Sequence, residues 1–320
     1  MSSAASRTAG AELVPVFVRE LDVAPGIHPR DTRWLGATSS LVCVGNHAYV
    51  VADDEHHLGH FTLDRREPLD LFRLFEGTLP HKKGKRKKTK PDLESLALLP
   101  PLPLYPYGAL LALGSGSRPT RNRATLLALD DSGKVQDGPL HVDLTPLYSP
   151  LQARFADLNI EGAFIAESQL HLLQRGNTGS AISARISYAW NAIEDWLLGV
   201  TVETPQATGV QLLDLGMIDG VPLTPTDGTP LADGKWLFCA VAENTVCSFT
   251  DGACLASLVG IADAHGRIEL LQHLKGNPKV EGIALEPGCD AAGNELSVLL
   301  VTDDDDPALA SRLLRCELRR

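Results

Sequence analysis

Acidic residues at the start of short apolar runs are the feature of this sequence that points most directly to chemistry. The stretch "KVEGIALEP" (279–287) places Glu281 just ahead of a run that otherwise has the composition of a buried strand. Similar stretches recur, and five of them align: "GATSSLVCVG" (36–45), "PDLESLALLP" (91–100), "LNIEGAFIAE" (158–167), "TPTDGTPLAD" (224–233) and "PKVEGIALEP" (278–287). The aligned key positions are Thr38, Glu94, Glu161, Asp227 and Glu281.

The five copies are spaced almost regularly, at intervals of 56, 67, 66 and 54 residues. Each copy is followed by a second apolar run, and most by a third and a fourth, with Gly, Pro, Asp and Asn between the runs. Short apolar runs separated by such turn residues are typical of all-β proteins. Four strands in each repeat is the pattern of a β-propeller blade. The sequence therefore predicts an all-β fold, a β-propeller.

Five blades account for the repeats best. From the fifth copy onward the chain supplies three strands, the last within "SRLLRCEL" (311–318), and we expect the N-terminal run "ELVPVFVRELDV" (12–23) to supply the fourth. Closing the ring with this strand removes two exposed sheet edges. Six blades is the alternative, because the long third repeat (159–223) has room for a degenerate blade. We expect residues 12–320 to form one domain after a disordered N-terminus at 1–11.

The aligned acids are predicted to meet, because the first strand of each propeller blade lines the central channel. The candidate metal ligands are Glu94, Glu161, Asp227 and Glu281. Residues just beyond the second strands, together with an arginine-rich loop, give a second set of candidate ligand-binding residues at the channel mouth: Asp53, Arg118, Arg175, Glu243 and Asp303. Up to seven carboxylates and one arginine would meet there, and an all-oxygen cluster favours Ca²⁺ or Mg²⁺ over zinc. The structural alternative is a water-filled channel whose acids only cap strand ends.

The composition is that of a globular protein, with 44% apolar and 22% charged residues. No run of eighteen apolar residues is present, so we expect no membrane segment. The six cysteines form no CxxC pair, and we expect reduced thiols in a cytoplasmic protein.

Charge narrows the class of partner. The chain has a net charge of −11, although the segment "KKGKRKKTK" (82–90) is strongly basic. An acidic body argues against nucleic acid as the main partner. The basic segment is predicted to be a flexible loop, or alternatively a flap that gathers polyanions. Arg118 and Arg175 suit a small-molecule ligand that carries a phosphate or carboxylate group.

The (D/N)-x-E-(G/S) pattern at 92–97 and 159–163, with its relative at 280–284, resembles β-propellers of the phytase-like, "esterase-like" families. It is similar, more distantly, to gluconolactonase-type propellers. The resemblance implies a metal-dependent hydrolase in which Ca²⁺ at the channel mouth polarises a phosphoryl or lactone oxygen. Glu94, Glu161 and Glu281 match the pattern as ligands, whereas Asp227 is one methylene shorter and Thr38 interrupts the ring.

Three functions follow from these patterns. The first is a metal-dependent hydrolase of a phosphate ester, an ester or a lactone, with no catalytic base assigned. The second is a non-catalytic propeller that binds a small molecule or a peptide at the same mouth. A structural or interaction module is the third.

Overall fold

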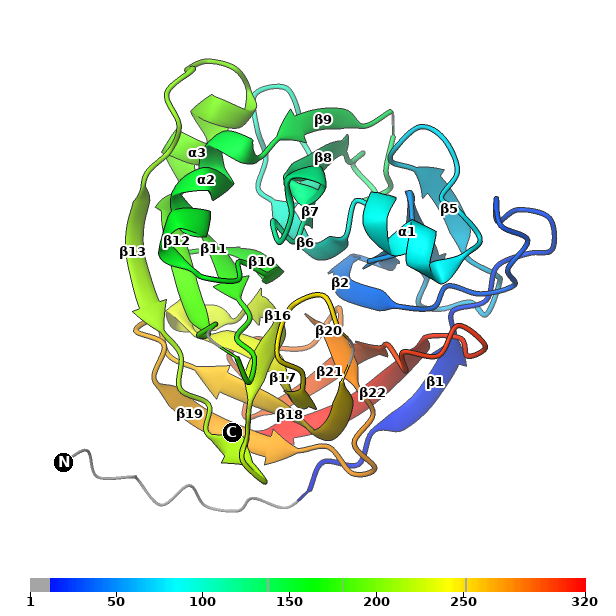
Figure 1. Cartoon of the computed structure of the whole chain (residues 1–320), viewed down its shortest axis with the longest axis vertical. Helices are drawn as coiled ribbons and strands as arrows, with labels where there is room; N and C mark the ends of the chain where they lie inside the picture. Colours follow the sequence, from blue (N-terminus) through cyan, green and yellow to red (C-terminus); the bar gives the residue numbers. More distant parts are fainter. Residues whose placement is uncertain (1–11, 137, 180, 251) are drawn as a thin grey trace.

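Five four-stranded antiparallel sheets lie around a central channel (Figure 1). The computed structural model describes residues 12–136, 138–179, 181–250 and 252–320. The innermost strands of neighbouring sheets contact one another around the whole ring. The predicted all-β, five-bladed propeller is therefore confirmed. The N-terminus predicted to be disordered, 1–11, lies outside the described residues.

Each blade runs outward from the channel. Blade 1 consists of β2 (Thr38–Val44), β3 (His47–Ala52), β4 (His57–Thr62) and β5 (Asp70–Arg73). Blade 2 consists of β6 (Leu93–Leu99), β7 (Ala109–Gly114), β8 (Arg123–Ala128) and β9 (Leu140–Asp143). Blade 3 consists of β10 (Ile160–Ala166), β11 (Gln169–Gln174), β12 (Ala184–Ala189) and β13 (Ala207–Leu212). Blade 4 consists of β16 (Thr224–Pro230), β17 (Trp236–Asn244), β18 (Ala253–Ala262) and β19 (Ile268–His273).

Blade 5 joins the two ends of the chain. It consists of β20 (Val280–Leu285), β21 (Glu295–Thr302), β22 (Arg312–Arg319) and β1 (Val16–Glu20). Figure 1 shows β1, in blue, beside β22, in red, and the two strands pair antiparallel from Val16 opposite Arg315 to Glu20 opposite Arg312. The N-terminal strand thus closes the ring, as the sequence predicts.

Short elements account for the extra length of the repeats. Helix α3 (Trp190–Leu197) and the two-stranded sheet of β14 (Met217–Ile218) and β15 (Val221–Pro222) use the length of the third repeat that would have allowed a sixth blade. Helix α2 (Thr145–Arg154) connects blades 2 and 3, and the 3-10 turns are η1 (Pro119–Arg121) and η2 (Ala232–Gly234).

The basic segment is helical. The sequence predicts a flexible loop at 82–90, but the structure has helix α1 (Lys83–Thr89) there. Arg86 is buried and donates to the carboxylate of Asp54 at 2.8 Å and to the carbonyl of His81 at 2.8 Å. These bonds fix a helix whose composition alone would favour a solvated segment.

Five apolar clusters hold the blades together, and each lies between two neighbouring blades. At the channel itself the backbones approach closely. A Cβ atom on Gly282 would lie 2.9 Å from the backbone nitrogen of Leu41 in the next blade, and one on Gly162 would lie 3.1 Å from the Cα of Asp227. The glycine that follows Glu161 and Glu281 is therefore needed for packing between innermost strands.

Two further predictions concern cysteines and membrane segments. All six cysteines are free, as expected for reduced thiols. None of the helices in the described part of the chain is long and apolar enough to cross a membrane.

Candidate functional site

Charged side chains from all five blades gather where the innermost strands begin, and we call this cavity the channel mouth. Its carboxylates are Asp53, Asp92, Glu94, Glu161, Glu243, Glu281, Asp303 and Asp305. Its basic residues are Lys87, Lys90, Arg121, Arg175 and Lys279. The sequence predicts up to seven carboxylates with one arginine, so the mouth is much closer to charge balance than expected.

β-bulges place the three glutamates of the repeat. The pairing between first and second strands shifts register at Glu94 in β6, at Glu161 in β10 and at Glu281 in β20, so each glutamate is the extra residue of a bulge. A bulge redirects its side chain away from the regular alternation of the strand. In blade 1 the same position is Ser39, one residue after the predicted Thr38. The repeat alignment was therefore right for three blades and shifted by one residue in blade 1.

Asp227 does not join the other three predicted ligands. In β16 the bulge lies at Thr226, and Asp227 pairs with Cys239 in the middle of β17. Its carboxylate lies inside the channel and accepts bonds from the Ser40 hydroxyl and from backbone N–H groups, at 2.9 Å from Ser40, 3.1 Å from Ile283 and 2.8 Å from Gly228. Burial raises the pKa of Asp227 well above its usual range, and these donors oppose the shift. Asp227 is thus a link between blades 4, 5 and 1.

Arg175 is the centre of one half of the mouth. Its guanidinium group forms ion pairs with Glu161 at 3.3 Å, with Glu281 at 3.7 Å and, most closely, with Glu243. Burial raises the pKa of Glu161 to about 8, since the opposing effect of Arg175 is smaller and Glu281 adds to the rise. Glu243 is the carboxylate that Arg175 compensates best. Burial alone would raise the pKa of Glu243, but Arg175 and Lys279 together lower it.

Lys279 extends this network into blade 5. Its ammonium group lies 3.3 Å from Glu281, 3.7 Å from Glu243 and 2.8 Å from Asp305. Asp303 accepts a bond from the backbone N–H of Asp305 at 2.8 Å. Burial raises the pKa of Asp303 well above its usual range despite the nearby charge of Lys279.

Asp92 anchors the other half of the mouth. It accepts bonds from Arg121 at 2.7 Å and from the Ser115 hydroxyl at 2.5 Å, and Lys90 lies 2.8 Å from its second oxygen. Lys90 also forms a close ion pair with Asp53. Burial would raise the pKa of Asp92, but Lys90 and Arg121 lower it.

Glu94 differs from its neighbours. It lines the mouth beside Asp92, yet its carboxyl group has no hydrogen bond and no ion pair among the described residues. Burial raises the pKa of Glu94 well above its usual range, and the negative charges of Asp92, Glu161 and Asp53 raise it further. A raised pKa favours the protonated form of Glu94, which is the form that can donate a proton.

Arg118, one of the two arginines in the second predicted set, does not line the mouth. Arg118 is exposed, and its guanidinium group stacks on the ring of Phe249 at 4.2 Å. Arg121, from the same loop, is buried and reaches Asp92 instead. The other members of that set all line the mouth, namely Asp53, Arg175, Glu243 and Asp303, and their role in ligand binding stays a prediction.

Some of the mouth residues that the motifs missed had a simple signal. Asp92 and Lys279 each stand two positions before a ring glutamate, Glu94 and Glu281 respectively, and Asn159 precedes Glu161 in the same way. A period of two counted back from each glutamate would have found them.

A second cavity of about 210 Å³ opens beside the channel mouth. It shares five residues with the mouth, namely Asp53, Lys87, Lys90, Asp303 and Asp305. Its other walls include Trp34 and His81, together with basic residues of α1. A small polar molecule therefore has room next to the charged groups.

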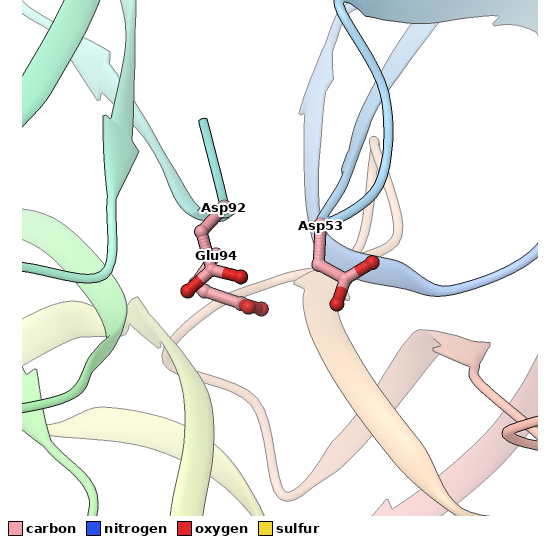
Figure 2. A group of neighbouring side chains, drawn as sticks. All are labelled: Asp53, Asp92 and Glu94. Atoms are coloured by element: carbon pink, nitrogen blue, oxygen red, sulfur yellow. The ribbon is translucent and has the colours of Figure 1, made fainter. Parts of the chain in front are cut away.

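The predicted metal ligands do not fit one common divalent ion. Asp227 lies deeper in the channel, and Glu161 and Glu281 are paired with Arg175 and Lys279. Glu94 instead lies with Asp53 and Asp92, and oxygens of these three carboxylates are within 4.8 Å of one another (Figure 2). The ammonium group of Lys90 is already bonded to two of them.

Similarity to the solved structure of a glutaminyl cyclase supports the fold. Glutaminyl cyclase from Myxococcus xanthus is similar with a TM-score of 0.51 and 13% identity, over 96% of this chain and 97% of that one. A putative exo-β-1,3-galactanase from Bifidobacterium bifidum s17 has a TM-score of 0.47 and 9% identity, over 95% and 93% of the two chains. Virginiamycin B lyase from Staphylococcus aureus gives 0.39 and 10%, over 94% and 88%. At 13% identity, the likeness to glutaminyl cyclase extends to the fold alone.

None of the curated protein sequences compared with the chain matches it. The resemblance to phytase-like propellers therefore stays a prediction. One family model does match, over residues 34–318, which span all five innermost strands. The chain belongs to that family, a family of unknown function (DUF6929).

Proposed function

We propose that the channel mouth is the active site of a hydrolase for a small polar substrate, a phosphate ester, an ester or a lactone, with Glu94 as its proton donor. The observation that carries the proposal is the position of Glu94, which faces the mouth without an ion pair or hydrogen bond while the carboxylates around it are held by cations. Catalytic acids are found in such environments, although structural networks also shift pKa values.

The fixed charges around Glu94 support this role. Lys90 and Arg121 hold Asp92 ionised next to it, and this negative charge favours the protonated form of Glu94. Arg175 and Lys279 line the same cavity and place positive charge near an oxygen that becomes negative during the reaction. The cavity of about 210 Å³ beside the mouth offers space for the rest of the substrate.

A hydrolytic step balances with these groups. Water attacks the carbonyl carbon or the phosphorus and the bond to the leaving oxygen breaks, while Glu94 gives its proton to that oxygen. The attacking water releases one proton, which returns to Glu94 and restores the acid. No step is assigned to a metal ion, because Glu161 and Glu281 are paired with Arg175 and Lys279 and Asp227 lies deeper in the channel.

A non-catalytic binding propeller is the second candidate, and the adjoining cavity favours it. Trp34, His81 and basic residues of α1 can recognise a small molecule that carries a phosphate or carboxylate group without any chemistry. The mouth and this cavity would then form one recognition site.

Turnover of three chromogenic or titratable substrates tests the proposal: p-nitrophenyl phosphate, p-nitrophenyl acetate and a γ-lactone. We expect one of them to be hydrolysed, with activity that falls at alkaline pH as Glu94 loses its proton. Glu94→Gln should lower kcat by about 100-fold or more, in the range of lost general acid catalysis. Glu286→Gln is the matched control, because Glu286 pairs with Arg315 away from the mouth.

Full activity in Glu94→Gln would remove Glu94 from the mechanism. If none of the three substrates is turned over but one of them raises the melting temperature of the protein, the binding propeller is the better description.

A further inference from the structure

The group of Asp53, Asp92 and Glu94 has the chemistry of a cation site. Their carboxylate oxygens lie within 4.8 Å of one another, and Figure 2 shows that they come together at the mouth from two neighbouring blades. Several carboxylate oxygens at this spacing are the ligands that Ca²⁺ and Mg²⁺ prefer. Which cation the cluster holds therefore depends on the groups that lie against these carboxylates.

A cation is present in the cluster, and it belongs to the protein. The ammonium nitrogen of Lys90 lies 2.8 Å from Asp92 and in close contact with Asp53. Lys90 is only 6% exposed, although lysine is almost never buried without a partner. Burial would lower the pKa of Lys90, but the charges of Asp53 and Asp92 raise it above its usual range. Lys90 thus stays charged although nearly all of its side chain is buried.

Helix α1 holds Lys90 in this position. Lys90 is the C-terminal cap of the helix, and its backbone N–H donates to the carbonyl of Arg86 at 2.8 Å. Arg86 is tied to Asp54 at 2.8 Å in blade 1, and Arg121 from blade 2 donates to the carbonyl of Lys87 at 3.2 Å. Contacts on both sides therefore fix the helix over the mouth. The basic segment 82–90 thus places the ammonium group of Lys90 between Asp53 and Asp92.

We infer that the ammonium group of Lys90 occupies the position that a divalent cation would take among Asp53, Asp92 and Glu94. The protein supplies its own cation here, and Ca²⁺ or Mg²⁺ enters only when that ammonium group is removed. A divalent ion at the same oxygens would adjoin a buried positive charge, which like-charge repulsion opposes. This inference does not depend on the proposed hydrolase activity.

Melting curves of the wild-type protein in excess EDTA and in millimolar CaCl₂ or MgCl₂ give the first test. We expect the same melting temperature in all three, and no stoichiometric metal by elemental analysis. A bound metal that EDTA removes with a fall in melting temperature would overturn the inference.

Lys90→Ala gives the second test, because it leaves the acids without their cation. We expect its melting temperature to fall by several degrees in EDTA and to recover in CaCl₂. Tb³⁺, followed by its luminescence, should bind Lys90→Ala about tenfold or more tightly than the wild type. The matched control is Lys235→Ala, which removes a partly exposed ion pair with Glu269 at 2.7 Å and should show no response to Ca²⁺.

Equal Ca²⁺ responses of Lys90→Ala and Lys235→Ala would also overturn the inference. Lys90→Met retains most of the hydrocarbon chain of lysine and replaces Lys90→Ala if the latter fails to fold. If neither variant folds, the wild-type measurement decides alone, since metal-independent melting supports the inference and bound metal contradicts it.

Discussion

The two ends of the central channel are built from the same five strands but have opposite chemistry. At the mouth, where the innermost strands begin, eight carboxylates and five basic residues line the cavity. At the other end the same strands form a depression of about 470 Å³. Its described lining is apolar, with residues such as Leu98, Phe164 and Leu285, and includes no charged side chain.

The contrast arises within single innermost strands, whose two ends carry different kinds of side chain. In β6, Glu94 lies near the start of the strand and lines the mouth. Leu98 and Leu99 lie at its end and line the apolar depression. The bulge near the start of the strand turns the acid to the mouth, and regular pairing beyond it packs apolar side chains. Asp227 lies between the two ends, where it joins blade 4 to blades 5 and 1. Polar chemistry and apolar packing are therefore separated along the channel, with one buried carboxylate between them.

Replacement of Asp227, which lies between the two ends, should have the largest effect on the free energy of unfolding. Asp227→Ala leaves the buried N–H groups of Ile283 and Gly228 and the hydroxyl of Ser40 without their acceptor. An unsatisfied buried donor costs about 1–3 kcal/mol, so we expect the free energy of unfolding to fall by about 3–5 kcal/mol. Urea denaturation followed by circular dichroism measures the loss.

Asp64→Ala is the control for this variant, since Asp64 is an exposed aspartate that bonds only to Asn46 at 2.6 Å and to local groups. Its denaturation midpoint should match that of the wild type. Equal midpoints for Asp227→Ala and the wild type would show that the link between the blades is not needed.

The pH dependence of stability should come from the charged end. The pKa of Glu161 rises from an ordinary value of 4.5 to about 8 in the folded protein, so the unfolded chain loses this proton first as the pH rises. Between these values the folded state binds more protons, and the free energy of unfolding therefore falls as the pH increases. One such group contributes a slope of at most about 1.4 kcal/mol per pH unit. Glu161→Gln should flatten the curve measured by denaturation from pH 4.5 to 8.

Glu94 and Asp303 also have raised pKa values, so part of the slope should remain in Glu161→Gln. The control is Glu295→Gln, whose exposed carboxylate pairs with Arg319 on the outer face of blade 5. Parallel curves for the wild type and Glu161→Gln would mean that Glu161 is ionised in the folded protein.

The fold and half of the mouth could be predicted because their signals are local. Blades 2, 3 and 5 repeat an acid, a small residue and an apolar run, and Glu94, Glu161 and Glu281 are found by that pattern. Asp227 is likewise an acid followed by glycine. The position of the bulge in β16, however, is set by pairing with β17, which cannot be read from the sequence. The number of blades followed from counting, whereas the register within a blade depended on tertiary contacts.

Lys90 could not be predicted from its surroundings in the sequence. Seven basic residues in nine positions are typical of a solvated segment. Lys90 is buried because Asp53 and Asp92, which lie in different blades, meet beside it. Its role depends on the folded ring, and the same is true of Arg121, which replaces the predicted Arg118 at the mouth.

A substitution at the apolar end of the channel should have the smallest effect on the free energy of unfolding. Leu98 is 40% exposed and lines the depression, so Leu98→Asp should alter the free energy of unfolding by only about 0.5 kcal/mol. It should nevertheless weaken the binding of an apolar fluorescent dye, because a carboxylate replaces part of the apolar lining. Leu104→Asp is the matched control, since Leu104 is 69% exposed and lies outside the lining. Equal dye binding by both variants would place the dye elsewhere.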